Sequence, residues 1–254
     1  MPELETRHLV KRFGGMQAIS DCNLRIAGGS ITGLIGPNGA GKSTVFSMIS
    51  GFLRSDGGEI WFKGRRIDGL PAHRVARLGI IRTFQTPHEL RELSVLENLM
   101  VVPRSQFGES LAGLLPFGGR RVRKEEHEIE ERAIAVLRTV GLEHHAQHRA
   151  ADLSGGQKKL LEIARCMMCN PKVALLDEPT AGVNPSLIND LMEVIRVLHN
   201  GGVTVVIIEH NMNVVMRLCG HVVVLDRGAV MCEGTPDSIQ RDERVLAAYL
   251  GSPP

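Results

Sequence analysis

Residues 36–44 read Gly-Pro-Asn-Gly-Ala-Gly-Lys-Ser-Thr and match the phosphate-loop pattern G-x-x-x-x-G-K-[ST]. The short apolar segment 30–35 before them is predicted to be a buried strand, and 45–49 after them to continue as a helix. Between a strand and a helix, glycines let several backbone N–H groups point at one anion, and the helix N-terminus adds partial positive charge. The pattern therefore predicts a nucleotide site rather than an ordinary glycine-rich turn.

The loop also supplies the side chains that phosphate chemistry needs. Lys42 can reach the β- and γ-phosphates, and the Ser43 hydroxyl is placed to bind Mg²⁺. The nucleotide-binding residues predicted from the loop are Gly36, Pro37, Asn38, Gly39, Ala40, Gly41, Lys42, Ser43 and Thr44.

The bulk composition limits the other possibilities. The 254 residues are 43% hydrophobic and 23% charged, which suits a folded α/β chain and argues against disorder. The formal net charge of +2 predicts no strong attraction to nucleic acid or anionic lipid. No apolar run approaches the ~18 residues of a membrane-spanning helix, and no secretory signal is visible. The five cysteines form no even-numbered disulfide set, so we expect a reduced, cytoplasmic protein.

The first 85 residues are expected to carry antiparallel strands beside the phosphate loop. Polar and apolar side chains alternate over 3–28, and further strands are expected at 57–62 and 80–84, with a short helix at 71–79 between them. Phe13 precedes a glycine turn. Its ring can belong to the core or can offer a flat face for adenine, and the sequence leaves both open.

Residues 86–150 show helical periodicity in place of the strand-like pattern before them, which predicts a helical lobe. A proline-and-glycine interruption at 113–119 marks an insertion, and the basic run 120–124 is predicted to be a solvated helix start. An exposed apolar lip at 111–117, facing a partner or a bilayer, is the less favoured alternative for this part.

Strands and helices alternate through the second half, which predicts a mostly parallel core sheet. The expected elements are helices over 158–168, 186–199 and 236–250, buried strands at 173–178 and 203–208, and a hairpin at 222–232.

Polar side chains end the predicted strands, and parallel strands bring their carboxyl ends to one edge of a sheet. Asp177 is the expected partner of Mg²⁺ through its outer coordination shell, and the adjacent Glu178 can polarise an attacking water. Gln85 and His210 end other strands, so an amide and an imidazole can reach the same edge. We therefore predict Glu178, His210 and Gln85 as catalytic residues and Ser43, Gln85 and Asp177 as metal ligands.

Together these segments resemble the ATPase subunits of ABC transporters, in the family's order and over essentially the whole chain. The resemblance rests on the phosphate loop, on Gln85 in the Q-loop, on the signature 153–157, on the Walker B segment 173–178 and on the switch histidine, His210. It implies ATP and Mg²⁺ as cofactors. It also implies an α/β fold of the P-loop NTPase type, with a mostly parallel core sheet, an antiparallel β subdomain and a helical lobe.

The resemblance implies further roles for single residues. In the family, two subunits sandwich two ATP molecules, and the signature of one subunit serves the nucleotide bound by the other. The signature residues of this chain are Ser154, Gly155, Gly156 and Gln157. Phe13 aligns with the position where the family stacks an aromatic ring on adenine. Asn184 stands where the family commonly has an aspartate.

We expect a single ABC ATPase domain over 1–254. Its expected parts are a β subdomain with the phosphate-loop core (1–85), a helical lobe with the signature (86–156), a RecA-like core (157–235) and a C-terminal helix and tail (236–254).

Finer features resemble the larger ATPase subunit of bacterial branched-chain, or hydrophobic, amino acid importers. These features are the runs 11–15, 82–85, 181–185 and 208–212, the insertion at 104–120 and the ending Tyr249-Leu250-Gly251. The resemblance implies a peripheral location at the cytoplasmic face of the inner membrane. The implied partners are integral-membrane permease subunits, a second ABC ATPase (a paralogue or another copy) and, indirectly, a solute-binding protein, with no nucleic acid.

Other functions stay open as alternatives. Urea or amide importers and the lipopolysaccharide exporter use related ATPases. A soluble, non-transport ABC ATPase usually carries two nucleotide domains or a long coiled-coil insertion, and a regulatory module without turnover is disfavoured because Glu178 is present.

Two other clusters receive structural interpretations. Cys166 and Cys169 have metal or redox spacing but no second pair beside them, so a structural role is predicted. The histidine-rich stretch 143–148 could bind a metal, although a solvated connector is the favoured interpretation.

Overall fold

The computed structural model describes residues 2–83, 89–103 and 119–250, and the chain divides into two compact units. The first unit comprises residues 1–85, 171–179 and 196–254, and the second comprises 86–170 and 180–195. Within the described ranges, no helix combines the length and the apolar character that crossing a membrane requires.

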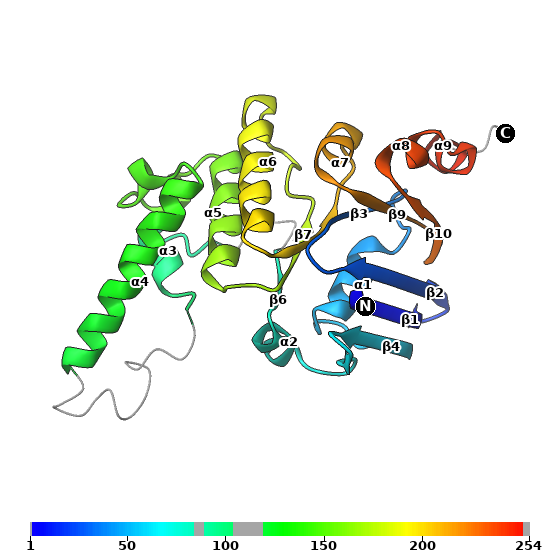
Figure 1. Cartoon of the computed structure of the whole chain (residues 1–254), viewed down its shortest axis with the longest axis horizontal. Helices are drawn as coiled ribbons and strands as arrows, with labels where there is room; N and C mark the ends of the chain where they lie inside the picture. Colours follow the sequence, from blue (N-terminus) through cyan, green and yellow to red (C-terminus); the bar gives the residue numbers. More distant parts are fainter. Residues whose placement is uncertain (1, 84–88, 104–118, 251–254) are drawn as a thin grey trace. The chain divides into compact units, whose positions relative to one another are not determined.

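The first unit is built on a sheet, in which ten strands are found among the described residues (Figure 1). The strand order is β5-β4-β1-β2-β10-β9-β3-β8-β7-β6. The strands are β1 (Pro2–Phe13), β2 (Met16–Ala27), β3 (Ile31–Ile35), β4 (Gly57–Phe62), β5 (Arg65–Arg66), β6 (Ile80–Arg82), β7 (Val173–Asp177), β8 (Thr204–Ile208), β9 (His221–Asp226) and β10 (Ala229–Gly234).

The sheet has a parallel core and an antiparallel part. Strands β9, β3, β8, β7 and β6 pair in parallel, whereas β2, β1, β4 and β5 form antiparallel ladders. Every residue of β3, β7 and β8 is buried, as expected for short apolar strands covered on both faces. The predicted mostly parallel core sheet and antiparallel β subdomain are confirmed.

The helices of the first unit differ from expectation near the C-terminus. They are α1 (Lys42–Ile49), α2 (Ala72–Leu78), α7 (Met212–Leu218), α8 (Pro236–Gln240) and α9 (Glu243–Leu250). Our prediction of one helix over 236–250 is wrong, because the chain turns at Arg241–Asp242. The Asp242 carboxylate accepts from the Arg244 N–H, and its backbone carbonyl accepts from Val245 and Leu246, so Asp242 starts a new helix.

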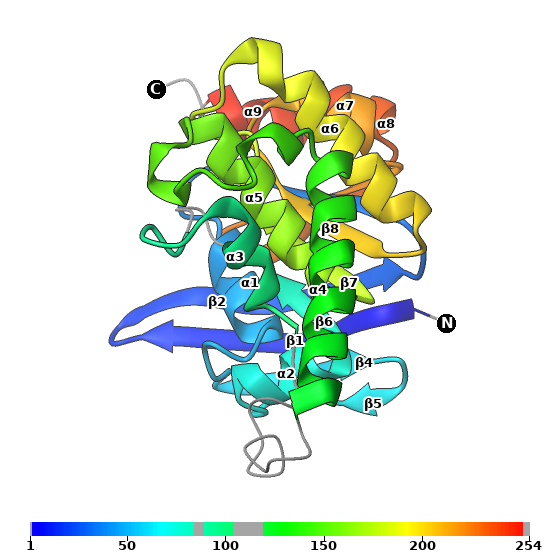
Figure 2. The ribbon, with the colours of Figure 1, turned by 90° about the vertical axis from the view of Figure 1, so that its left-hand side faces the viewer.

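The second unit is helical, and Figure 2 shows the long α4 running beside α3 and α5. Its helices are α3 (Val95–Met100), α4 (Gly119–Thr139), α5 (Gly155–Met168) and, from its start to residue 195, α6 (Pro185–Asn200). Short 3-10 turns lie at Glu143–His145 and Ala150–Asp152. Buried side chains such as Leu99, Leu137 and Leu160 form its interior.

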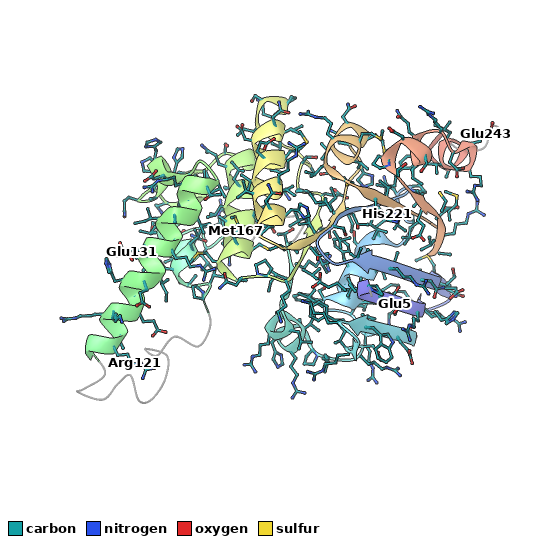
Figure 3. The ribbon with its side chains drawn as sticks, in the orientation of Figure 1. Glu5, Arg121, Glu131, Met167, His221 and Glu243 are labelled. Atoms are coloured by element: carbon teal, nitrogen blue, oxygen red, sulfur yellow. The ribbon has the colours of Figure 1, made fainter. Side chains whose placement is uncertain are left out.

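The basic run at the start of α4 is solvated, as predicted. The Arg121, Arg123 and Lys124 side chains are exposed, and Figure 3 labels Arg121 together with Glu131 farther along the same helix. The apolar stretch 111–117 lies outside the described residues.

Helix α5 begins at Gly155, three residues before the predicted start. The Ser154 hydroxyl accepts from the Gln157 N–H, and the Gln157 side chain accepts from the Ser154 N–H. This reciprocal pair is a capping box of the S-x-x-Q type. Because it stabilises a first helical turn, it outweighs the low helix propensity of the glycine pair.

Asp242 should show the effect of its pairing with Arg244 in a pH titration. The hydrogen bond from Arg244 is the main reason that the pKa of this carboxyl falls from 3.8 to about 2. Since the folded pKa is depressed, the carboxylate stabilises the fold above pH 3.8, and that stabilisation is lost as the pH falls through about 2. By NMR titration, Arg244→Gln should move the pKa back toward 3.8, whereas Arg241→Gln should not. An Asp242 pKa near 3.8 in the wild type would contradict this account.

Candidate active site

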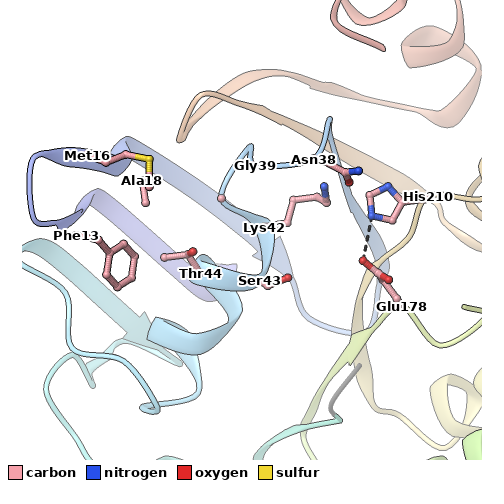
Figure 4. A pocket seen from close by; sticks show the side chains of 11 residues that line it. Phe13, Met16, Ala18, Asn38, Gly39, Lys42, Ser43, Thr44, Glu178 and His210 are labelled. Atoms are coloured by element: carbon pink, nitrogen blue, oxygen red, sulfur yellow. Dashed lines mark hydrogen bonds and ion pairs between the residues drawn. The ribbon is translucent and has the colours of Figure 1, made fainter. Parts of the chain in front are cut away.

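A pocket of about 320 Å³ opens in the first unit beside the phosphate loop (Figure 4). It is lined by Phe13, Met16, Ala18, Asn38, Gly39, Gly41, Lys42, Ser43, Thr44, Glu178 and His210. These residues come from the β1–β2 hairpin, from the loop and the start of α1, and from the segments that follow β7 and β8. The pocket therefore brings together residues that the sequence identified separately.

The phosphate loop packs so closely against its neighbours that two of its positions require glycine. Gly36 has a φ of 147°, and a Cβ there would lie 2.1 Å from the carbonyl oxygen of Leu225. Gly41, the residue before α1, has a φ of 101°, and its Cβ would lie 2.4 Å from Ile19. Neither φ suits an ordinary side chain.

Lys42 lies at the first position of α1 with its ammonium group turned back over the loop. Its Nζ donates to the carbonyl oxygens of Gly36 at 2.7 Å and of Pro37 at 3.0 Å. Burial lowers its pKa, although the carboxylates of Glu178 and Asp177 act in the opposite direction. A cation that is buried next to backbone carbonyls at a helix N-terminus is suited to binding phosphate.

Glu178 follows β7 in a conformation that few residues adopt. Its φ is 48°, in the left-handed region, and its N–H donates to the carbonyl of Ile208. The Glu178 Oε1 lies 3.0 Å from the Nε2 of His210 (Figure 4). Strained backbone of this kind concentrates at functional sites. The structure thus places both predicted residues in the pocket and adds a contact that the sequence did not predict.

Asp177, one residue earlier, is buried and paired with Arg82 of β6. Arg82 Nη2 donates to Asp177 Oδ2 at 2.8 Å, and Nη1 donates to the hydroxyl of Ser47 at 2.7 Å. That hydroxyl donates in turn to the carbonyl of Ser43. Arg82 therefore ties the end of β7 to α1. Sequence reasoning gave Arg82 no such role, because its partner lies 95 positions away.

The residues of this edge fit a magnesium ion. Asp177 Oδ1 is buried and has no hydrogen-bond partner among the residues that the structure describes. The Ser43 hydroxyl lines the pocket. Hydroxyl and carboxylate oxygens are the donors that Mg²⁺ prefers. Gln85, the third predicted ligand and a predicted catalytic residue, lies outside the described residues.

Phe13 does not belong to the core. It is 47% exposed and lines the pocket, so of the two possibilities only the open ring face agrees with the structure. Lys11 lies over this ring, with its Nζ 5.5 Å from the centroid. The sequence missed the neighbouring pocket residues Met16 and Ala18, which carry no motif.

The signature residues lie in the second unit, at the start of α5. Ser154 and Gly155 are exposed, whereas Gly156 is buried. A Cβ at Gly156 would lie 2.9 Å from the Cδ1 atom of Leu187, so α5 lies close to α6 at this position. Gln157 also contacts the ring of His145, at 3.0 Å.

Asn184 has a structural role at the start of α6. Its side-chain oxygen accepts from the N–H and the hydroxyl of Ser186, each at 3.1 Å, while Pro185 begins the helix. This is the arrangement of an N-cap residue followed by proline.

The cysteine and histidine clusters both lie in the second unit. Cys166 is buried, and burial raises the pKa of its thiol. The rings of His145 and His148 contact each other through Nδ1 atoms 3.1 Å apart. In the part of the chain that the structure describes, no three His, Cys, Asp or Glu side chains gather as a metal site.

Removing Arg82 should destabilise the fold strongly. Arg82→Gln leaves the carboxylate of Asp177 buried without its cation, which we expect to cost about 3–5 kcal/mol of unfolding free energy, measured by urea denaturation. Arg138→Gln, which breaks an exposed pair with Glu143, is the control and should change stability little. Equal midpoints for the two variants would disprove the role of Arg82.

Comparison with known proteins identifies the family. Residues 19–181 match the ABC transporter family, and residues 229–253 match a second one, described as branched-chain amino acid ATP-binding cassette transporter. The high-affinity branched-chain amino acid transport ATP-binding protein BraF of Pseudomonas aeruginosa is 43% identical, over 98% of each chain.

Solved structures with a similar fold are also ATP-binding cassettes. The ADP conformation of MJ1267, an ATP-binding cassette of an ABC transporter, has a TM-score of 0.85 and 37% identity and covers 99% of this chain and 100% of its own. A dimeric, post-hydrolysis structure of the cassette MJ0796, bound to ADP and Pi, has a TM-score of 0.76 and 25% identity, over 92% of this chain and 98% of its own. The phosphate loop, the carboxylates and the full-length likeness lead to one conclusion: the chain belongs to the ABC transporter family and is one of its ATP-binding-cassette ATPases.

Proposed function

We propose that this chain hydrolyses ATP to power an importer of branched-chain or other hydrophobic amino acids. The observation that carries the proposal is the pocket in which Lys42 of the phosphate loop meets Glu178 and His210. The match at 229–253 and the likeness to BraF support the amino acid class over urea, amide or lipopolysaccharide transport.

In this proposal the pocket holds ATP along its length. Adenine stacks on the exposed ring of Phe13, since aromatic faces bind flat heterocycles well. Loop residues after Pro37 donate backbone N–H groups to the phosphates, and the ammonium group of Lys42 moves from its carbonyl partners to the β- and γ-phosphates. The start of α1 adds partial positive charge.

Hydrolysis depends on one water molecule held beside the γ-phosphate. Glu178 accepts the proton of this water as the water oxygen attacks phosphorus and the bond to the ADP oxygen breaks. His210 keeps the Glu178 carboxylate in place through their contact and can donate to the γ-phosphate. The strained φ of Glu178 fixes the direction of that carboxylate.

The metal ligands proposed are Ser43 and Asp177, with Gln85 as a further one. Mg²⁺ held by these residues would neutralise part of the phosphate charge. Arg82 holds one oxygen of Asp177 and leaves the other to this task.

Turnover requires a second ATPase subunit, either a paralogue or another copy. The exposed Ser154 and Gly155, with Gly156 and Gln157, are proposed to meet the nucleotide of that subunit, and the dimeric structure of MJ0796 supports such an assembly. We propose that both units act as a single ATPase domain over 1–254, at the cytoplasmic face of the membrane and against permease subunits. A solute-binding protein takes part indirectly.

The test is Glu178→Gln, which removes the proton acceptor and keeps the shape of the side chain. We expect ATP turnover to fall at least a hundredfold while ATP still binds, and an ATP-dependent dimer to accumulate in gel filtration. Glu193→Gln, on α6, is a matched control and should turn over normally. Unchanged turnover in Glu178→Gln would refute the assignment of Glu178.

A further inference from the structure

We propose that Tyr249, in the C-terminal helix α9, positions the phosphate loop and so raises the affinity for nucleotide. Its hydroxyl oxygen accepts a hydrogen bond from the N–H of Gly36 at 2.8 Å, across 213 residues of sequence. The inference rests on the proposed nucleotide site, because Gly36 is the first residue of the phosphate loop.

The N–H of Gly36 lies at a tightly packed position of the loop. Gly36 adopts its φ of 147° directly against the carbonyl oxygen of Leu225, at the end of β9. Gly228, in the β9–β10 turn, donates to the carbonyl of Ala40. The hairpin thus contacts the loop at its first residue and in its middle, and the Tyr249 hydroxyl accepts from the N–H of that first residue.

Tyr249 reaches this position because of the way its helix starts. Asp242 ends the turn after α8 and begins α9, which carries Tyr249 one residue before its end. The side chain is 38% exposed, so part of its ring faces solvent while its hydroxyl contacts the loop. A phenol that is more than a third exposed contributes less to packing than a fully buried one, while its hydroxyl contacts the loop directly.

The contact belongs to the part of the chain that distinguishes this branch of the family. The second family match, residues 229–253, begins at β10 and includes both α8 and α9. Within this segment the Tyr249 hydroxyl contacts the loop directly, and that single group can be removed while the ring is kept.

The consequence is a coupling between α9 and nucleotide. If the hydrogen bond holds Gly36 in its bound conformation, the loop needs less ordering when phosphate arrives, and affinity rises. By reciprocity, bound nucleotide must strengthen the docking of α9 by the same factor.

The first experiment uses the wild-type chain, in which Tyr249 is the single tyrosine. Labelling tyrosine with ¹³C at Cζ gives one NMR resonance, which we expect to shift on titration with Mg-ADP. The dissociation constant fitted to this shift should equal the one measured by calorimetry. A resonance that stays fixed while calorimetry shows saturation overturns the inference and leaves the proposed function intact. No ADP binding by calorimetry overturns both.

The second experiment separates affinity from chemistry. Tyr249→Phe deletes one hydroxyl, and we expect the dissociation constant for ADP and the KM for ATP to rise about threefold to tenfold, with kcat at saturation unchanged. Leu246→Ala is the control, because Leu246 lies on the same helix and is 47% exposed. Equal affinities for Tyr249→Phe and the wild type, or equal losses in Tyr249→Phe and Leu246→Ala, overturn the inference.

Discussion

The proposed active site depends on a backbone contact that only glycine permits. At Gly36 the chain leaves β3 with no room for a Cβ beside the carbonyl of Leu225, and at Gly41 it enters α1 against Ile19. These two positions bend the loop so that its backbone N–H groups can surround a single anion. The β9–β10 hairpin and the hydroxyl of Tyr249 form hydrogen bonds with the backbone of the loop. The loop is thus supported by parts of the chain that lie far away in sequence.

The two adjacent carboxylates at the end of β7, Asp177 and Glu178, have different environments, and only Glu178 lines the pocket. Asp177 is buried and forms an ion pair with Arg82. The cost of burying both ions is offset by the hydrogen bond between them and by a second one from Arg82 to the Ser47 hydroxyl. Glu178 lies in the pocket, strained at its backbone and held by His210. We therefore propose different tasks for these adjacent residues at one strand end: Asp177 for the metal and Glu178 for the reacting water.

Much of this could be predicted because the informative patterns are local. The glycine loop, the apolar strands before it and at β7 and β8, and the polar residues at their ends are all visible in short windows. What failed depends on contacts over distance or on side-chain capping. Asp242 divides a helix that looked continuous, and the Ser154–Gln157 pair starts α5 early. Arg82 and Tyr249 act through partners 95 and 213 residues away, which no pattern reveals.

If the phosphates of ATP bind at the phosphate loop next to Lys42, removing the ammonium group must weaken the affinity for ATP. The first measurement is therefore the ATP affinity of the wild type and of Lys42→Ala, titrated in parallel with Mg²⁺ present. We expect saturable binding by the wild type and an affinity about tenfold to a hundredfold weaker in the variant, because a charge-assisted contact is removed. Circular dichroism of the variant confirms that it is folded. Equal affinities in two folded proteins would contradict the account, since ATP would then bind elsewhere.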